Sequence, residues 1–180
     1  LAEICNREYR VLMRVAIERA KEAQVVIMCG VSGSGKTFFA RRLEQAGFCR
    51  ISSDNIVWNK YGSDFTHFPL QRQKEIFMEA QHELVQQMVS LIDTGNKVVV
   101  DSTMCRRSKR DQMRALCISK GIQPVIVYMS APLHILKERL SERKDTGPDD
   151  LIVDEKNLYR FYTNFEIPYI DENAIICNSI

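Results

Sequence analysis

Short apolar segments alternate along this chain with longer segments in which apolar residues recur every three to four positions. The short segments contain Val and Ile without polar alternation, which is typical of strands buried on both faces. Strands are predicted at 24–29, 48–53, 97–101, 124–129 and 174–178. Helices are predicted at 1–22, 36–46, 70–92, 107–120 and 132–144. This alternation predicts an α/β fold with a five-stranded, mostly parallel sheet and helices on both faces.

Composition and charge are those of a soluble globular domain. The chain has 180 residues, of which 45% are hydrophobic and 27% are charged, a balance that supplies one domain with its own core. We expect a helical extension at 1–22 and a single domain at 23–180. No apolar run approaches the ~20 residues of a membrane span, so no membrane partner is expected. A net charge of +2 argues against a general nucleic-acid coat protein.

Cysteine and histidine spacing argues against a disulfide framework and against a zinc site. The six cysteines contain no CxxC pair, and the three histidines share no metal-ligand spacing. Scattered cysteines of this kind fit a reducing compartment, so we expect a cytoplasmic location.

The most specific motif follows the first predicted strand. Residues 30–37 are GVSGSGKT, which matches the GxxxxGK(S/T) pattern of a phosphate-binding loop. Backbone N–H groups of such a loop, together with a helix N-terminus, bind phosphate oxygens. The residues expected to bind the nucleotide are Gly30, Ser32, Gly33, Ser34, Gly35, Lys36 and Thr37. Lys36 would reach the β- and γ-phosphates, and the Thr37 hydroxyl would ligate Mg²⁺.

Two aspartates stand where predicted strands end. Ligands of a doubly wound sheet bind outside the carboxyl ends of its strands, so Asp54 is expected to face the phosphate loop and to accept the proton of an attacking hydroxyl. The alternative is that Ser53 or Asp54 only caps a helix beginning at Asn55. Asp101 is expected to hold Mg²⁺ through water or to orient the acceptor, since a buried carboxylate needs a cation or N–H partner.

Two arginines lie where a polar segment at 142–150, predicted to be a lid, begins. Arg139 and Arg143 are four residues apart, so they share one helix face. A guanidinium delivered by a closing lid would neutralise charge on the transferring phosphoryl group. Arg143 is expected in this catalytic role, and Arg139 is expected to bind the nucleotide. The alternative is pairing on the helix surface, for example with Glu138.

A basic run at 106–110 follows Asp101. Such a run is most often a solvated helix face, but its position keeps Arg106 and Arg107 as candidates for binding an anionic substrate. A group of aromatic residues after Asp54 would either wall an acceptor pocket or form a small satellite of the core. These aromatic residues are Trp58, Tyr61, Phe65 and Phe68.

Several segments together resemble a group of small phosphate-loop kinases. The segments are GVSGSGKT, ISSDNIVWNKYG, VVVDSTMCRRSKRDQMRAL, RLSER and NLYRFYTNFEIP, which span roughly residues 24–178. The group includes polynucleotide 5′-hydroxyl kinases, zeta-type toxins and chloramphenicol phosphotransferase. The resemblance implies a nucleoside-kinase-like P-loop NTPase fold with the first strand central, and ATP with Mg²⁺ as ligands. It also implies Lys36 on the phosphates, Thr37 on Mg²⁺, Asp54 as the base and Arg143 as the lid arginine.

The sequence therefore predicts an ATP-dependent kinase that transfers the γ-phosphoryl group to a hydroxyl of a small molecule. Similar polynucleotide kinases carry Arg three residues after the catalytic Asp, where this chain has Val57. The alternatives are a polynucleotide 5′-hydroxyl kinase whose basic run at 106–114 tracks a backbone, a slowly hydrolysing nucleotide switch, and a toxin acting on a sugar nucleotide. A helicase or chaperone ATPase is not expected, because Asp101 is followed by Ser102 rather than Glu.

Overall fold

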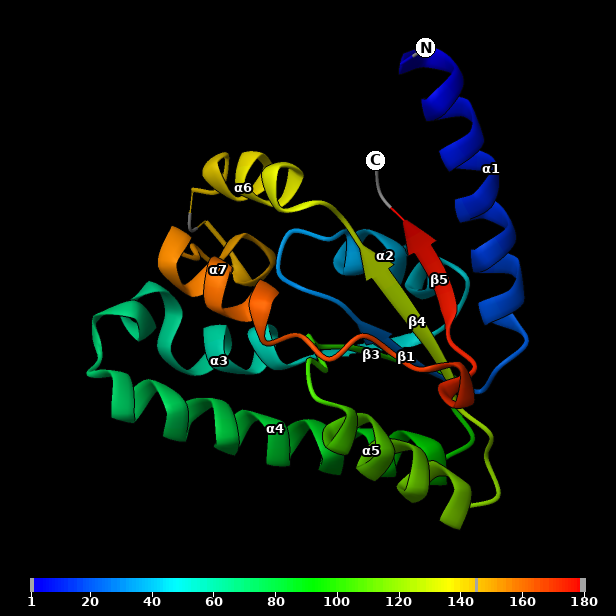
Figure 1. Cartoon of the computed structure of the whole chain (residues 1–180). Helices are drawn as coiled ribbons and strands as arrows, with labels where there is room; N and C mark the ends of the chain where they lie inside the picture. Colours follow the sequence, from blue (N-terminus) through cyan, green and yellow to red (C-terminus); the bar gives the residue numbers. More distant parts are fainter. Residues whose placement is uncertain (1, 145, 179–180) are drawn as a thin grey trace.

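The computed structural model describes the backbone at 2–144 and 146–178, and side chains from residue 9 onward except at 63, 64, 66, 145, 150, 179 and 180. Within this part, five parallel strands form one sheet in the order β2-β3-β1-β4-β5 (Figure 1). The predicted α/β fold and parallel sheet are confirmed, with β1 at the centre. None of the described helices is long and apolar enough to cross a membrane.

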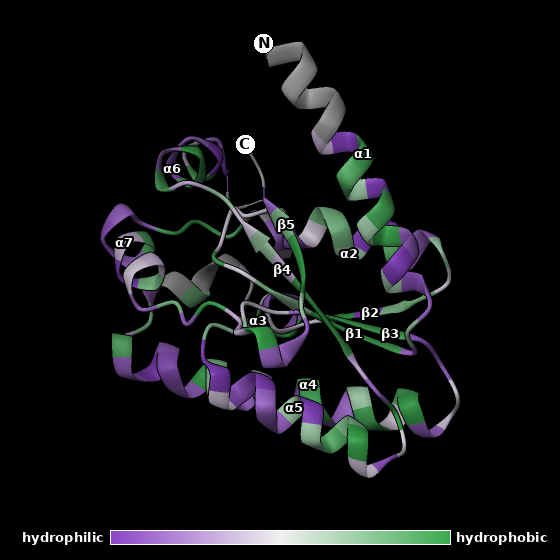
Figure 2. Ribbon diagram, turned by 45° about the vertical axis from the view of Figure 1, so that its right-hand side comes forward, coloured by the Kyte–Doolittle hydropathy of each residue, from purple (hydrophilic) through white to green (hydrophobic). Residues whose placement is uncertain are grey.

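The strands coincide with the Val- and Ile-rich segments. Their bounds are β1 Val25–Cys29, β2 Cys49–Ser52, β3 Val98–Asp101, β4 Val125–Ser130 and β5 Ile175–Asn178. Successive residues of β1 point to opposite faces, so Val25 and Ile27 enter one core cluster and Val26 and Met28 enter the other. Both faces of the sheet are therefore covered, as unalternating strands require. Figure 2 shows the central strands as hydrophobic and the outer surfaces of the helices as largely polar.

Helices cover the sheet in two layers. On one face lie α3 (Ser53–Tyr61), α4 (Leu70–Asp93) and α5 (Arg107–Ser119). On the other face lie α1 (Ala2–Lys21) and α2 (Lys36–Gln45). The predicted N-terminal extension thus packs on the sheet, because Met13, Ala16 and Ala20 of α1 are buried in the same cluster as Val26.

A third, smaller cluster joins α6 (Leu133–Ser141) and α7 (Glu155–Thr163) near the carboxyl ends of the strands. Three short 3₁₀ helices complete the described elements, η1 at Gly62–His67, η2 at Pro148–Asp150 and η3 at Ile170–Glu172. The predicted lid at 142–150 runs from the end of α6 through η2. Its first residues were predicted as helix, but α6 ends at Ser141.

Helix α7 was not among the predicted helices. Leu158, Phe161 and Tyr162 have the i, i+3, i+4 spacing of a helix face, but the element is nine residues long, so the repeat covers little more than one turn. Leu158 is its buried residue, whereas Tyr159, Phe161 and Tyr162 are 58%, 40% and 40% exposed. Local capping marks its start instead, since the Asp154 carboxylate accepts a hydrogen bond from the Asn157 N–H at 2.8 Å.

Three of the four aromatic residues after Asp54 pack in or against the core, namely Tyr61, Phe65 and Phe68. Phe65 is buried and meets Phe77 of α4 edge to face, with ring centroids 5.1 Å apart. Tyr61 meets Phe68 in the same way at 5.7 Å. These two edge-to-face pairs pack in or against the core, which favours the satellite alternative over an acceptor wall for Tyr61, Phe65 and Phe68.

Candidate active site

The phosphate-binding loop joins the central strand β1 to α2 and has the backbone shape that its glycines predict. Gly30 has a φ of 149°, and a Cβ there would lie 2.4 Å from the Met129 carbonyl oxygen. Gly35, immediately before α2, has a φ of 101°. Side chains other than hydrogen are strained at both positions. The Gly30 N–H also donates to the Thr103 carbonyl at 3.0 Å, which ties the loop to the end of β3.

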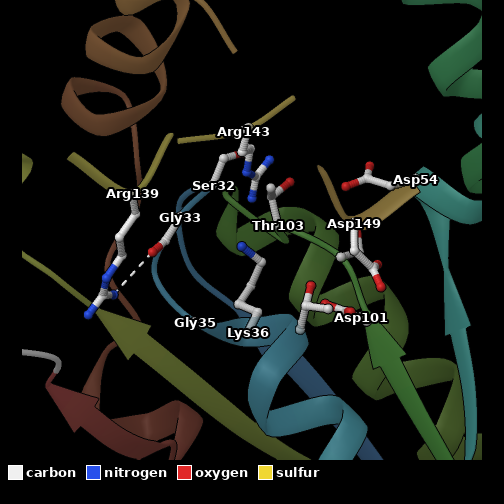
Figure 3. A pocket seen from close by; sticks show the side chains of 12 residues that line it. Ser32, Gly33, Gly35, Lys36, Asp54, Asp101, Thr103, Arg139, Arg143 and Asp149 are labelled. Atoms are coloured by element: carbon white, nitrogen blue, oxygen red, sulfur yellow. Dashed lines mark hydrogen bonds between the residues drawn. The ribbon is translucent and has the colours of Figure 1, made fainter. Parts of the chain in front are cut away.

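A pocket of about 180 Å³ opens beside this loop (Figure 3). Most of the predicted site residues meet there. Those that line it are Ser32, Gly33, Gly35, Lys36, Thr37, Asp54, Asp101, Arg139 and Arg143. Gly30 and Ser34 belong to the same loop but do not line the pocket. The pocket is also lined by Ser102, Thr103 and Asp149, which were not predicted to be site residues.

Lys36 supplies a buried amine to the pocket. Its Nζ donates to the Val31 carbonyl at 2.9 Å, within the loop itself. Burial lowers its pKa, and the Asp101 and Asp54 carboxylates oppose this effect. A buried ammonium next to a glycine loop at a helix N-terminus is a donor set that suits phosphate oxygens. The residues present therefore fit a nucleotide phosphate group.

Asp54 occupies the first turn of α3 and points toward the pocket (Figure 3). The cap of α3 is Ser52, whose Oγ accepts a hydrogen bond from the Asn55 N–H at 3.4 Å. The alternative in which Ser53 or Asp54 caps a helix beginning at Asn55 is therefore wrong. Burial, followed by repulsion from Asp101, raises the pKa of Asp54 to about 6, although Lys36 and Arg143 act in the opposite direction. Such a carboxyl is a stronger base than an exposed aspartate.

The raised pKa of Asp54 predicts a pH-dependent cost to stability. The folded chain holds this proton more tightly than the unfolded chain, since about 6 exceeds 3.8. The protonated Asp54 carboxyl therefore contributes stability fully below its unfolded pKa of 3.8, and this contribution is lost as pH rises through about 6. We expect the unfolding free energy of Asp54→Asn, measured by urea titration near neutral pH, to exceed that of wild type by about 3 kcal/mol. The difference should vanish near pH ~4, where both folded side chains are neutral; an equal gain at both pH values would contradict this origin.

Asp101 ends β3 and has an arginine as its partner. Its Oδ2 accepts from Arg50 Nε at 2.9 Å and from Arg50 Nη2 at 2.7 Å. The pairing of Ser52 with Asp101 in the β2–β3 register brings the two strand ends together. The sequence predicted a cation or N–H partner for the Asp101 carboxylate but did not identify Arg50 as that partner. The available signal was a charged residue within a strand otherwise expected to be buried.

Arg139 and Arg143 reach the pocket from the α6 side. Arg143 Nη1 donates to the Leu151 carbonyl at 2.7 Å, and the guanidinium points toward the pocket near Thr103 (Figure 3). Arg139 Nη1 donates to the Gly33 carbonyl at 3.2 Å, so it contacts the phosphate loop. Two cationic groups therefore lie on the wall where the phosphates of a bound nucleotide are expected.

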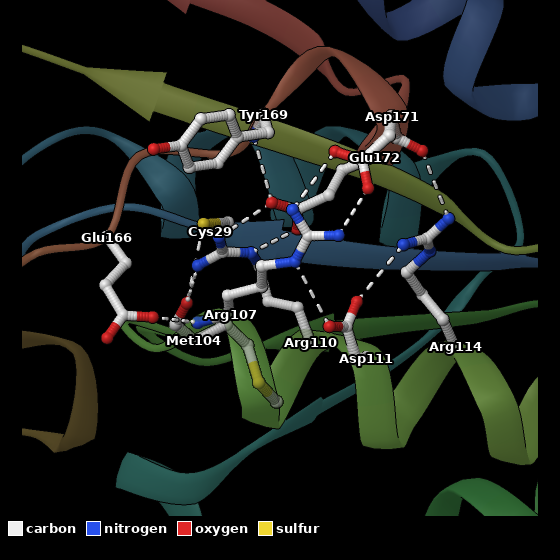
Figure 4. Close-up of polar contacts among 10 residues, drawn as sticks. All are labelled: Cys29, Met104, Arg107, Arg110, Asp111, Arg114, Glu166, Tyr169, Asp171 and Glu172. Atoms are coloured by element: carbon white, nitrogen blue, oxygen red, sulfur yellow. Dashed lines mark hydrogen bonds and ion pairs between the residues drawn. The ribbon is translucent and has the colours of Figure 1, made fainter.

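Arg106 and Arg107 lie outside the lining of this pocket. Arg107 forms ion pairs with Asp171 and, at 3.3 Å, with Asp111 (Figure 4). Arg106 is exposed at the N-cap position of α5. The structure thus places Arg107 in a surface network, and the predicted substrate role of both residues stays a prediction.

Comparison with known proteins places this fold and loop in a family. A family model described as an AAA domain matches residues 25–168. The chain belongs to this family. Its fold is that of small kinases: a sugar kinase from Janibacter sp. HTCC2649 superposes with a TM-score of 0.62 at 21% identity, covering 86% of this chain and 84% of that one. A gluconokinase from Sinorhizobium meliloti 1021 gives 0.61 at 18% identity, covering 86% and 81%. The resemblance to small phosphate-loop kinases is confirmed.

A relative in sequence is the L-seryl-tRNA(Sec) kinase of Methanococcus maripaludis, 25% identical over 139 residues. The match covers 75% of this chain and 51% of the relative. The chain thus spans about half the length of the curated relative that it matches.

Behind the loop, this AAA-family domain contains an ion pair that the sequence did not reveal. Arg110 and Glu172 have fully buried side chains, with Arg110 Nε and Nη2 donating to the carboxylate at 2.6 and 2.9 Å (Figure 4). Arg110 Nη1 also donates to the Met104 carbonyl at 3.0 Å. Met104 has a φ of 43°, unusual for a side chain of its size. The ion pair thus stabilises the strained backbone at Met104. The residue before it, Thr103, accepts the hydrogen bond from Gly30 of the phosphate loop.

Proposed function

We propose that this protein is an ATP-dependent kinase that transfers the γ-phosphoryl group to a hydroxyl of a small molecule. The observation that carries the proposal is that Asp54 and Lys36 face one pocket. A phosphate-binding loop by itself only holds a nucleotide, whereas a carboxylate opposite it can receive the proton of an attacking hydroxyl. The family match and the shared kinase fold support the same class of reaction.

In the proposed step, the acceptor oxygen forms a bond to the γ-phosphorus as the bond to the β,γ-bridging oxygen breaks. The acceptor proton passes to a carboxylate oxygen of Asp54, and ADP leaves with the bridging oxygen and both electrons of the broken bond. Lys36 and the loop N–H groups would hold the phosphates. Arg143 and Arg139 would offset the negative charge of the phosphoryl group. The protein acts by positioning and electrostatics rather than by covalent chemistry.

Two pocket residues suit the Mg²⁺ that accompanies ATP. Thr37 lines the pocket in the first turn of α2, and Asp101 lines it at the end of β3. Hydroxyl and carboxylate oxygens are the donors that this ion prefers. Thr37 would ligate it directly and Asp101 through water, and the bound ion would neutralise phosphate charge.

Two features favour a small acceptor over a polynucleotide. Val57, which stands where similar polynucleotide kinases carry an arginine, is fully buried. Several basic side chains on the α3–α5 face are engaged by carboxylates instead of being free to track a backbone. These pairs are Lys60 with Glu83, Arg72 with Glu75 and Glu79, and Arg107 with Asp111 and Asp171.

Label transfer from γ-labelled ATP tests the proposal. The protein, with Mg²⁺, would be offered a protein-free small-metabolite extract, 5′-hydroxyl oligonucleotides and L-seryl-tRNA(Sec), the substrate in the relative's name. We expect label in a small molecule, because the volume of the pocket is about 180 Å³ and its cationic residues are proposed to bind the phosphates of ATP. Lys36→Ala should lose this transfer, since the amine on the β- and γ-phosphates is gone.

The other arms decide between the alternatives. Label on oligonucleotides or on the tRNA alone would replace the small acceptor with a nucleic-acid one. Label only in free phosphate, with every acceptor present, would contradict a kinase and indicate a nucleotide-hydrolysing switch.

A further inference from the structure

Asp149, in the segment 142–150, contacts two elements of the body of the protein. Asp149 Oδ1 accepts a hydrogen bond from Arg50 Nη2 at 2.5 Å, and Asp149 Oδ2 accepts one from Arg41 Nη2 at 2.5 Å. Arg50 lies in β2 and Arg41 in α2, about a hundred residues earlier in the chain. Burial raises the pKa of Asp149, but the bonds from Arg50 and Arg41 outweigh it and hold the pKa below its ordinary value.

Arg50 holds two carboxylates at once. Its Nε and Nη2 both bond Asp101 Oδ2, and the same Nη2 reaches Asp149. The side chains of Arg50, Asp101 and Asp149 are 6%, 4% and 19% exposed. A planar guanidinium can hold such an arrangement rigidly, whereas a lysine amine cannot. Without Arg50, Asp101 and Asp149 would stand beside Asp54 as three carboxylates in one pocket, with strong mutual repulsion.

The attachment extends from Asp149 to Arg143. Leu151, two residues after Asp149, is buried, and its carbonyl accepts the bond from Arg143 Nη1 at 2.7 Å. η2, which contains Asp149, also packs against α3, the helix that carries Asp54. Fixing Asp149 therefore fixes the carbonyl against which the Arg143 guanidinium rests, and with it the position of that guanidinium in the pocket.

We infer that Arg50 is a positioning residue for phosphoryl transfer. Its contact with Asp149 fixes the position of Arg143, and its contact with Asp101 fixes a second side chain that lines the same pocket. This inference rests on the proposed kinase function for its effect on rate. The contact itself is independent of that function, because it joins residues of the free protein. We call the Arg50–Asp149–Arg41 contacts the tether.

Two variants break the tether differently. Arg50→Gln removes the guanidinium from both carboxylates, whereas Asp149→Asn leaves the Arg50–Asp101 pair in place and sits at a more exposed position. The second variant keeps the test valid if the first folds poorly. The matched control is Arg42→Ala, since Arg42 is the next residue of α2, is exposed, and contacts Gln45 and the Phe38 ring instead.

Amide hydrogen exchange of the free protein is the first measurement. Both tether variants should exchange faster than wild type across 142–151, because both lose the anchoring at Asp149, while central strand β1 keeps its protection. Arg42→Ala should match wild type. Unchanged exchange at 142–151 in both tether variants would overturn the tether, whatever the protein's activity.

Transfer kinetics with the identified acceptor are the second measurement. A displaced Arg143 should lower kcat by on the order of 10- to 100-fold, and more γ-phosphate should go to water relative to the acceptor. The double variant Arg50→Gln/Asp149→Asn should lose little beyond the worse single variant, because both break one contact. Faster exchange with wild-type kcat and partition would overturn the positioning role. A wild-type protein that transfers no label would overturn the proposed function, and the exchange result would still decide the tether.

Discussion

Replacing Asp54 by asparagine is expected to slow phosphoryl transfer about 10²- to 10⁴-fold, the range typical of losing a positioned general base. The amide keeps the shape of the side chain but cannot take the acceptor proton at neutral pH. ATP affinity should change little, because the phosphates are expected on Lys36 and the loop rather than on Asp54. The measurement is single-turnover transfer to the identified acceptor, with ATP binding followed at equilibrium.

The pH profile sharpens this prediction. The pKa of Asp54 is raised to about 6, so wild-type kcat/KM should fall as pH drops through about 6, where the carboxylate becomes protonated. Asp54→Asn should lack this limb. The control is Asp93→Asn, since Asp93 pairs with Lys120 at 2.6 Å and does not line the pocket. Transfer at the wild-type rate in Asp54→Asn would remove the base from the mechanism.

Replacing Arg110 by methionine is expected to cost about 3–5 kcal/mol of unfolding free energy, because the Glu172 carboxylate would stay buried without its cation. The Arg110 and Glu172 side chains are both 0% exposed. The change also removes the donor to the Met104 carbonyl, in the strained turn beside the phosphate loop. ATP affinity should therefore fall as well. Urea unfolding at fixed pH measures the first effect, and equilibrium binding measures the second.

The double variant Arg110→Met/Glu172→Leu separates the ion pair from packing. Replacing both partners by apolar side chains should recover most of the lost stability, since no charge is left buried. Arg107→Ala, which removes a neighbouring but exposed partner of Asp171, should shift the urea midpoint far less. A single variant as stable as wild type would show that the buried charge of Glu172 is satisfied in some other way.

The sheet and the phosphate loop were predictable from the order of the amino acids. The strands were predictable because runs such as residues 98–100 contain only β-branched side chains, whose burial on both faces requires neighbours on both sides. The loop was predictable because its chemistry is local: the residues that curl around phosphate are consecutive. The places of Asp54 and Asp101 in the pocket were predictable from the strands. Each residue stands at or just after a strand end, and parallel strands end on one edge of the sheet.

The pairing of charged residues, in contrast, depends on how the chain folds in three dimensions. Arg50 meets Asp101 and Asp149, and Arg110 meets Glu172, at separations of 51, 99 and 62 residues. Periodicity carries no signal over such distances, because the pairing depends on strand register and on where the chain returns after α7. For the same reason the basic run at 106–110 could not be divided in advance. Arg110 is wholly buried against Glu172, whereas Arg107, one turn earlier at the first residue of α5, pairs with Asp171 near the surface. The two arginines are three residues apart and share one helix face, so helical spacing could not separate them.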